Sequence, residues 1–595
     1  MSNSVLSTSW IESAIASYTQ VQTEKRIQPI QTRKTRYENL STAWSNVSAK
    51  LTSLQSIVNS LKSSSSSSIF NSSTAELSTD DFFSVTASSN ATQSSYTMRV
   101  EQLAKSDLAV SDTMDSSTSV TSMAGAHRIK IQSGDYVSYV DVELTSSETN
   151  ESIMEEIRDA INNDYAVVES AKMTATDTYT GSGSFVINVN GTETTIDYDY
   201  SSGGYTYDDV VDDIINKINS DVDGVTAEKE TDASGNVGFK ITVDNKNQYI
   251  TINQSDDTGT LLDSSHFNID VQNEKSANAL ATASVFSPLS DKSKFSITAK
   301  NSGYENRLIM SDESGSALNF LGLTSTILTN HTQTTNDTDA GFMYSANSST
   351  DNELDAVVEF NGITVRRSSN TITDLVDNLT FSLRATMESS DSDVNITVTN
   401  DVDTIEEKIE DFVTKFNDVY TYIKNNSYSG ESGRGIFTGN STASSLLTTL
   451  RTLVTSEVEG IPDGNLSYLS DIGISFDSSS GLSISDSSKL EDAILNKVDQ
   501  VADLFNSTNG IATQMYDMID DYIGADGTIT NTINTIDNNV SYLNDRIESI
   551  NESIEKSAES LREQYHRLQE QLAQLLYAQQ YFNSMFSGMM GGSLY

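Results

Sequence analysis

The chain has 595 residues, with 84 Asp and Glu against 36 Lys and Arg, so its formal net charge is −48. A surface with this charge repels nucleic acid and anionic lipid, and we expect neither as a partner. The chain has no cysteine, which excludes disulfides, thiolate nucleophiles and Cys-ligated metals. No apolar run approaches the roughly eighteen residues that a membrane span needs, and no cleavable signal pattern opens the chain, so we expect no membrane insertion.

Residues 1–62 are expected to form a helical export and coiled-coil segment. From Tyr37, apolar side chains follow one another at steps of three and four, and the pattern ends at the serine run Ser63 to Ser68. This spacing is typical of a coiled-coil seam. The polar stretch from Met1 to Ser9 reads equally well as an uncleaved export signal or as a disordered end. The predicted seam residues are Leu40, Trp44, Val47, Leu51, Leu54, Val58 and Leu61.

Residues 63–105 read as a linker and the start of a leg domain. After the serines, Phe82 to Val85 and Ser95 to Val100 alternate apolar and polar side chains, as half-buried strands do. We expect these two strands to share one small sheet.

Two β-rich head regions are expected next, at residues 106–275 and 276–400. Strand patterns followed by an amphipathic helix occur around residues 127–161 and again around 185–243, and a shorter copy of the same pattern occurs at 357–398. In the last two, Asn190-Gly191 and Asn361-Gly362 join two alternating runs, which predicts hairpins with type I′ turns. The middle of the chain is therefore read as repeated α+β modules.

Residues 401–526 are expected to form a helical leg domain, because apolar residues return to helical spacing from Thr404. A hairpin around Ile472 to Ile484 interrupts the helices. The predicted fold class is thus multidomain α+β, with N- and C-terminal helices forming a coiled-coil or helical-bundle leg that carries the inserted β-rich head domains.

Residues 527–595 are expected to form one long coiled-coil helix. Neither Gly nor Pro occurs between Gly527 and Gly588, so the helix could reach about 90 Å at 1.5 Å per residue. Two successive steps of four near Ile554 form a stutter, which predicts a local unwinding of the supercoil. The predicted partner-contacting residues of this seam are Ile536, Val540, Leu543, Ile547, Ile550, Ile554, Leu561, Leu568, Leu572 and Leu575.

The two terminal seams are expected to pair with each other. Residues 1–62 hold seven Lys or Arg against three Asp or Glu, net +4, and residues 527–595 hold four against eight, net −4. Opposite charges beside two apolar seams favour their association modestly. The alternative is that each seam meets the same helix in a neighbouring copy, and both arrangements stay open.

We expect no enzyme activity, no metal and no cofactor. The four histidines, His127, His266, His331 and His566, are far apart in sequence, whereas a histidine site needs several placed together. Acidic pairs are expected by chance in so acidic a chain. The runs at Asp221 to Gly224 and Asp391 to Asn395 do not complete a calcium loop and are read as turns, with calcium a minor alternative.

The order of several short motifs resembles the flagellar hook-associated protein 2 family, the filament cap proteins. Each motif is weak alone, but their order and spacing are specific. The motifs lie in the N-terminal heptads, at Tyr96 to Ala104, Asn361 to Leu375, Asp411 to Asn417, Leu469 to Ile474, Gly481 to Asp486, Lys489 to Leu490 and Val501 to Phe505.

The resemblance implies a structural cap of the bacterial flagellum, in which an oligomeric plate at the filament tip promotes folding and insertion of exported flagellin. The implied partners are further copies of the chain, about five in all, flagellin, the hook–filament junction protein and an export chaperone. Separately from the resemblance, the Ser/Thr-rich β-modules with their tyrosines permit binding of host or surface glycans as an added role in adhesion. The implied location is extracellular, after export by the flagellar type III pathway without a cleaved signal peptide. The alternative reading is a surface adhesin, or another flagellar axial protein such as flagellin or the junction protein.

Overall fold

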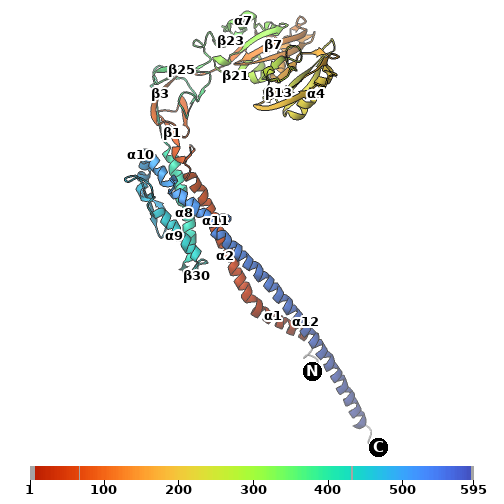
Figure 1. The fold of residues 1–595 in the computed structure, drawn as a ribbon, viewed down its shortest axis with the longest axis vertical. Helices are drawn as coiled ribbons and strands as arrows, with labels where there is room; N and C mark the ends of the chain where they lie inside the picture. The colour runs from red at the N-terminus through yellow and green to blue at the C-terminus, as the bar shows by residue number, and fades with distance from the viewer. Residues whose placement is uncertain (1–6, 66, 431–432, 591–595) are drawn as a thin grey trace. The chain divides into compact units, whose positions relative to one another are not determined.

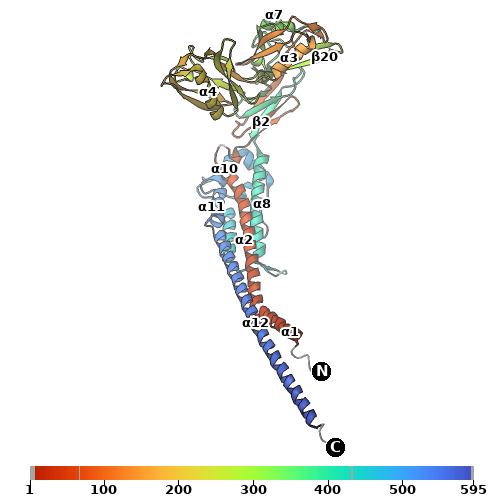
Figure 2. The same cartoon turned by 90° about the vertical axis from the view of Figure 1, so that its right-hand side faces the viewer.

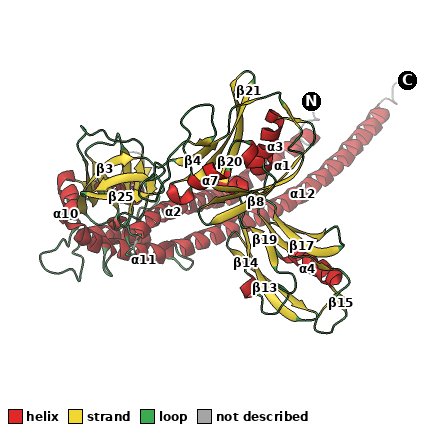
Figure 3. Cartoon of the chain, turned by 90° about the horizontal axis from the view of Figure 1, so that it is seen from above, coloured by secondary structure: helices red, strands yellow, loops and turns green. Residues whose placement is uncertain are grey.

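The computed structural model describes residues 7–65, 67–430 and 433–590, which form two compact units. Unit 1 comprises Met1–Thr74, Ser88–Gln93 and Thr399–Tyr595, and unit 2 comprises Ala75–Ala87 and Ser94–Val398. Unit 1 is mainly helical and unit 2 holds most of the strands, as the colours of Figure 3 show. The six-part division expected from the sequence is finer than these two units and stays a prediction.

Unit 1 is built from long helices contributed by both ends of the chain (Figure 1). A π-helical turn, η1 (Thr23–Ile27), joins the first two helices. Two short hairpins, β29 (Ser429–Gly430) with β30 (Gly433–Arg434) and β31 (Ile474–Asp477) with β32 (Gly481–Ile484), lie between the later helices. The helices are α1 (Thr8–Gln22), α2 (Gln28–Leu61), α8 (Val402–Ser427), α9 (Ser441–Thr455), α10 (Ser487–Asn506), α11 (Ile511–Ile523) and α12 (Thr528–Met590).

The predicted long C-terminal helix is confirmed, since α12 spans 63 residues. Figures 1 and 2 both show α2 alongside the first half of α12 and α1 alongside a later part of it, while α12 continues past α1. Three of the shorter helices begin at side-chain caps: Asp401, Asn440 and Asp486 each accept a hydrogen bond from a backbone N–H in the first turn.

Unit 2 contains a five-stranded antiparallel sheet and a separate three-stranded one near its chain boundaries with unit 1. The strand order of the larger sheet is β1 (Ser73–Leu77), β28 (Val394–Asn400), β3 (Ser94–Gln102), β24 (Ala356–Phe360), β25 (Ile363–Arg367). The smaller sheet has the order β2 (Phe83–Ala87), β27 (Leu379–Leu383), β26 (Thr371–Ile372).

The expectation that Phe82 to Val85 and Ser95 to Val100 share one sheet is therefore wrong. Strand β2 pairs with β27, whereas β3 pairs with β24 and β28. Alternation of polar and apolar residues reports that a strand is half-buried, but it does not choose the partner strand, and here every partner lies hundreds of residues away.

The rest of unit 2 contains two modules with separate cores. In the first module, α3 (Asn150–Asn162) shares a core with two sheets. One sheet contains β20 (Ala281–Leu289), β21 (Lys292–Ser302), β4 (Ser106–Val110), β23 (Gly341–Phe342) and β5 (Met114–Asp115). The other contains β22 (Ile309–Ser314), β7 (Gly125–Ser133) and β8 (Tyr136–Leu144). In the second, α4 (Tyr207–Asp221) shares a core with β13 (Ser182–Val189), β14 (Thr192–Asp199), β18 (Ile250–Ile252), β10 (Val167–Ser170), β11 (Met173–Thr174), β16 (Val225–Thr231), β17 (Asn236–Val243) and β19 (Ile269–Asn273).

Both predicted Asn-Gly hairpins are confirmed. Asn190 and Gly191 have φ of 52° and 85°, and Asn361 and Gly362 have φ of 49° and 81°, as a type I′ turn requires. Each asparagine also makes the same pair of bonds to a third segment. The backbone N–H of Asn190 donates to the carbonyl of Tyr249, and the side-chain oxygen of Asn190 accepts from the N–H of Tyr249. Asn361 makes the same two hydrogen bonds with the backbone of Thr97.

Candidate assembly surface

The N-terminal seam lies in the core of unit 1. Trp44, Val47, Leu51, Leu54, Val58 and Leu61 are fully buried and Leu40 is half-buried. They share one apolar cluster with residues of α8, α9, α10 and α11, and with Ile529 and Ile536 at the start of α12. This face of α2 therefore packs on several helices of its own chain, more than the one partner that a simple two-helix seam supplies.

The first half of the C-terminal seam is covered by the N-terminal helices. Ile536, Leu543, Ile550 and Ile554 are buried, and Val540, Ile547 and Leu561 are half-buried. Ile27, in η1, clusters with Ile550 and Ile554, and Ile30 joins them at the edge. Further along α12, Ile11 and Ile15 of α1 cluster with Ala558.

The stutter predicted near Ile554 coincides with the π-helical turn of the facing segment. Ile550, Ile554 and Ala558, three residues at successive steps of four, are all buried. Opposite them the covering chain passes from α2 through η1 to α1. Both helices thus depart from a regular repeat at the same level, which lets the apolar contact continue across the irregularity.

The contact between α1 and α12 ends with an aromatic pair and an ion pair. The rings of Trp10 and Tyr565 meet edge to face with centroids 5.5 Å apart. Arg562 donates from Nε and Nη2 to the two carboxylate oxygens of Glu12, at 3.0 and 3.1 Å. This bidentate bond lowers the pKa of the Glu12 carboxyl, and it raises the pKa of Arg562.

Beyond Tyr565 the seam residues are exposed. Leu568, Leu572 and Leu575 have exposed fractions of 48%, 42% and 67%. Tyr577, Tyr581 and Met585 are exposed as well. They lie on a different side of the helix, because the step of two residues from Leu575 to Tyr577 turns the side chain by about 200°, and the other two follow Tyr577 at steps of four. We call residues 566–587 the apolar end of α12. So large an apolar surface is typical of a protein-interaction site.

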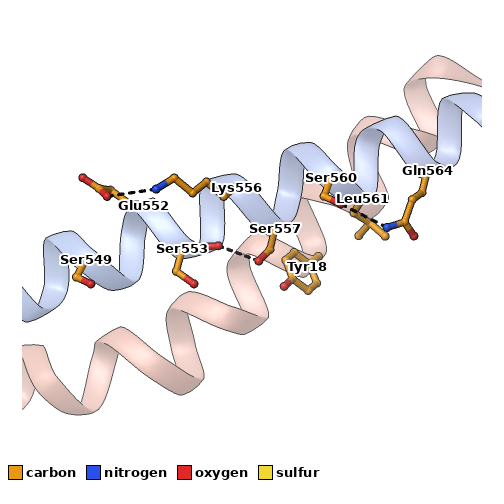
Figure 4. A pocket seen from close by; sticks show the side chains of 9 residues that line it. All are labelled: Tyr18, Ser549, Glu552, Ser553, Lys556, Ser557, Ser560, Leu561 and Gln564. Atoms are coloured by element: carbon orange, nitrogen blue, oxygen red, sulfur yellow. Dashed lines mark hydrogen bonds and ion pairs between the residues drawn. The ribbon is translucent and has the colours of Figure 1, made fainter.

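A polar groove of about 610 Å³ runs along α12 before the apolar end (Figure 4). Tyr18 of α1 lines it from one side. On α12, Glu552 and Lys556 form an ion pair, Ser557 donates to the carbonyl of Ser553, and Gln564 donates to Ser560. Each of these bonds joins two residues that are four positions apart on α12.

The modest attraction expected between the basic residues 1–62 and the acidic residues 527–595 stays a prediction. The ion pair that joins them among the described residues is Glu12 to Arg562, in which the signs are reversed. Arg33 and Arg36 of α2 lie on the flank of the helix pair opposite to the acids from Asp545 to Glu559, whereas Lys34 pairs with Glu38 of its own helix. Net charge counted over a segment does not say on which side of the helix the charges lie.

Two contributors to this surface were missed by the sequence analysis. Ile11, Ile15 and Tyr18 of α1 follow steps of four and three, and Met515, Met518 and Tyr522 of α11 do the same. Both patterns span fewer than four turns, and the first begins at Ile11, shortly after the polar stretch from Met1 to Ser9. Periodicity over so short a window predicts a helix but not its partner.

The other candidate sites gain no support as catalytic centres. His266 bonds Asp263, three residues away, and His331 lies 3.2 Å from the buried Asp107 and stacks on Phe342. Over the described ranges, no group of three or more His, Asp or Glu is placed to hold a metal ion. Within the same ranges, every helix is too short or too polar to cross a membrane.

Sequence comparison places both ends of the chain in one family. The model of the flagellar hook-associated protein 2 N-terminus matches residues 7–107, and that of the C-terminus of the same protein matches residues 354–576. The chain belongs to the flagellar hook-associated protein 2 family. The two matches include α1, α2, α8 to α11 and most of α12, so the family's own regions contain the surface described above up to residue 576.

Individual relatives match over part of their length. Flagellar hook-associated protein 2 of Treponema pallidum is 28% identical over 209 residues, which are 29% of this chain and 28% of the relative. The B-type flagellar hook-associated protein 2 of Pseudomonas aeruginosa is 24% identical over 174 residues, 28% of this chain and 36% of the relative. The matches thus span about a third of these curated relatives.

Among solved structures, the D1, D2 and D3 domains of the flagellar cap protein from Escherichia coli are similar at 18% identity, with a TM-score of 0.49. That similarity covers 83% of this chain and 99% of the other.

Two of the motifs that carry the family resemblance meet in unit 1. Asn417 of α8 accepts from the N–H of Leu482 at 2.7 Å and donates to its carbonyl at 2.8 Å. Gly481 has φ of 89°, and a Cβ there would lie 2.0 Å from Oδ1 of Asn417. The glycine and the asparagine are therefore needed together to dock the β31–β32 hairpin on α8.

Proposed function

We propose that the chain is a structural cap protein of the bacterial flagellar filament and has no enzymatic role. The observation that carries this proposal is the family match of both chain ends, because these ends also build the helical unit and its uncovered apolar end. The similar Escherichia coli structure is described as a flagellar cap protein.

In this proposal several copies, about five, assemble at the filament tip outside the cell and promote the insertion of exported flagellin. The partners are further copies of the chain, flagellin, the hook–filament junction protein and, before export, a chaperone. Export follows the flagellar type III route without a cleaved signal peptide. The seam residues from Leu40 to Leu575 hold the helical unit together and, beyond Tyr565, contact these partners.

The apolar end of α12 is the part of unit 1 that this role uses most directly. Three exposed leucines on one helix face add little to the stability of a single chain, whereas their burial against a partner would stabilise an assembly. Their exposure therefore favours a protein that works in contact with others over a free-standing binding module.

The test is complementation of a strain that lacks this gene. We expect the parent chain to restore filaments and motility, and a variant with Leu568, Leu572 and Leu575 changed to Ser to leave short or no filaments with flagellin released into the medium. Leu495→Ser is the matched control, because Leu495 of α10 is 44% exposed in the same unit. Normal filaments in the strain without any copy of the gene would exclude a cap role.

A further inference from the structure

Helix α2 and the turn before it carry a strip of exposed cations without partners. Residues 25–37 contain five Lys or Arg and no Asp or Glu, in a chain where acids outnumber bases more than twofold. Four of the five are exposed, and none of these four makes an ion pair or a side-chain hydrogen bond with any described residue. We call this group the basic strip: Lys25, Arg26, Arg33 and Arg36.

The spacing of the basic strip places its four charges on one side of the helix. Arg26 and Arg33 are seven residues apart, and Lys25 and Arg36 are eleven apart, so each pair is separated by a nearly whole number of turns. Beside Arg36 lies a groove of about 420 Å³, lined by polar residues of α2 and by Ile436. This side of α2 is therefore open to a partner.

Helix α12 carries a complementary strip of acids. Asp545, Glu548, Glu552, Glu555 and Glu559 follow one another at unbroken steps of three and four, and all five are exposed. Two of them have partners within α12, since Glu552 pairs with Lys556 and Glu559 with Arg562. We call these five residues the acidic strip.

The two strips lie at overlapping heights along the helix pair. Ile27 packs beside Ile550 and Ile554, and Ser41 donates to Asp537 at 2.9 Å, so α2 and α12 run antiparallel with residue 27 level with about residue 552. The N-terminal half of the basic strip is thus level with the middle of the acidic strip.

The strips face opposite flanks of that pair. Ile30 faces α12. At about 100° per residue, Arg33 and Arg36 lie about 60° and 120° from Ile30 around the axis of α2, both in the same direction of rotation. The acids Glu548 and Glu555 are turned about 80° to 100° in the other sense from Ile547. In an antiparallel pair, opposite senses of rotation lead to opposite flanks, which explains why the strips do not pair within one chain.

We propose that the basic strip of one copy binds the acidic strip of the next. Two different surfaces on opposite flanks make a head-to-tail contact, which generates a ring when the rotation closes. The level heights allow neighbouring copies to stand side by side without a large axial shift. This inference rests on the proposed function in one respect, because it takes the assembly to contain several copies of the chain.

The first experiment reverses charges in the full-length protein. We expect R33E/R36E to raise the dissociation constant between copies by about tenfold or more in sedimentation at low salt. The control K497E/R451E changes two exposed cations elsewhere in unit 1 and should stay within about twofold of the parent. Adding E548K/E555K to the first variant restores the charge match, and we expect most of the parent affinity to return.

The second experiment uses the absence of cysteine in the chain, so that any disulfide joins introduced residues. We mix an R26C chain with an E552C chain that carries a size tag, and expect the mixed dimer to form on oxidation. A K34C chain, whose side chain lies on the other flank, should give far less mixed dimer with E552C. Circular dichroism melting of each variant checks that it is folded.

The outcomes separate this inference from the proposed function. A parent chain that assembles while R33E/R36E keeps the parent affinity, or while the four-residue variant fails to recover, overturns the inference alone. A parent chain that stays monomeric at every concentration overturns both. Loss with R33E/R36E, recovery with the compensating pair and selective cross-linking support the contact.

Discussion

Glu12 and Arg562 form a bidentate ion pair between α1 and α12, with both donor–acceptor distances close to 3 Å. They are separated by 550 residues in sequence, and their pairing holds the N-terminal end of α1 against α12. Beyond this point the apolar side chains of α12 are exposed. The pair therefore marks the boundary between the part of α12 that belongs to unit 1 and the part left for other molecules.

Docking of α1 should weaken in acid. Arg562 holds the pKa of Glu12 below its usual value of 4.5, and the nearby His566 acts in the same direction. A lowered carboxyl pKa stabilises the folded state above the unfolded value, and this contribution is lost as the pH falls through the folded value. We expect the fluorescence of Trp10, in a Trp44→Phe background, to change below about pH 4.5 as α1 leaves α12.

Glu12→Gln is the control for this titration, because it keeps the shape of the side chain without its charge. In that variant the fluorescence should be flat across the same pH range. An equal transition in both proteins would assign the acid sensitivity to other carboxyls. Since Glu12 is exposed to solvent, raised salt should reduce the difference between the two proteins.

Trp44 should be a major contributor to the stability of unit 1. Its side chain is fully buried and packs on Phe437 with ring centroids 4.5 Å apart. Trp44→Ala is expected to lower the free energy of unfolding by about 3–5 kcal/mol, measured in urea. Tyr542→Ala, on an exposed aromatic of α12, should stay within about 0.5 kcal/mol of the parent. Trp44→Phe should lower the free energy of unfolding by less than Trp44→Ala, because Phe keeps an aromatic ring in the core. Nε1 of Trp44 has no hydrogen-bond partner among the described residues, so Phe loses no hydrogen bond.

Sequence patterns predicted the elements of unit 1 well because its helices are long. The α12 seam repeats over many turns, and α8 and α10 also show several turns of regular apolar spacing. The Asn-Gly turns were equally predictable, since positive φ at two successive positions is a local requirement. These features depend on residues close together in the chain.

Partner choice was harder to predict. The strands of β2 and β3 look alike, yet each pairs with a different distant strand. The seam at Leu568 continues the one at Leu561 at the same steps of four and three, yet Leu561 is half-buried and Leu568 is exposed. How much of the seam is covered depends on where α1 begins, at Thr8, and no local pattern around Leu568 contains that information.

Asn417 should be essential for docking the β31–β32 hairpin. Its side chain makes two hydrogen bonds to the backbone of Leu482, and Ala would leave both backbone groups without that partner. We expect Asn417→Ala to destabilise unit 1 by about 1–3 kcal/mol in chemical unfolding. Asn425→Ala, on an exposed asparagine of the same helix, is the control and should stay within about 0.5 kcal/mol.

Two truncations should separate the structural part of α12 from its assembly part. Ending the chain after Tyr565 removes the apolar end and residues 588–595 but none of the buried core residues, so we expect the melting temperature of unit 1 to stay close to that of the parent. Ending it after Asp526 also removes Ile529 and Ile536 from the core and uncovers α2, so unit 1 should melt at a clearly lower temperature.

Both truncated proteins should fail to build filaments in the complementation test, because both lack the exposed leucines. The chain that ends at Asp526 loses both core stability and the exposed leucines, whereas the chain that ends at Tyr565 loses the exposed leucines but none of the buried core residues. Comparing the two therefore separates unfolding from the loss of assembly contacts. If the chain ending at Tyr565 melts like the parent and still supports normal filaments, the apolar end is not an assembly surface. If it melts like the parent and supports none, the loss comes from missing contacts with other molecules and not from unfolding.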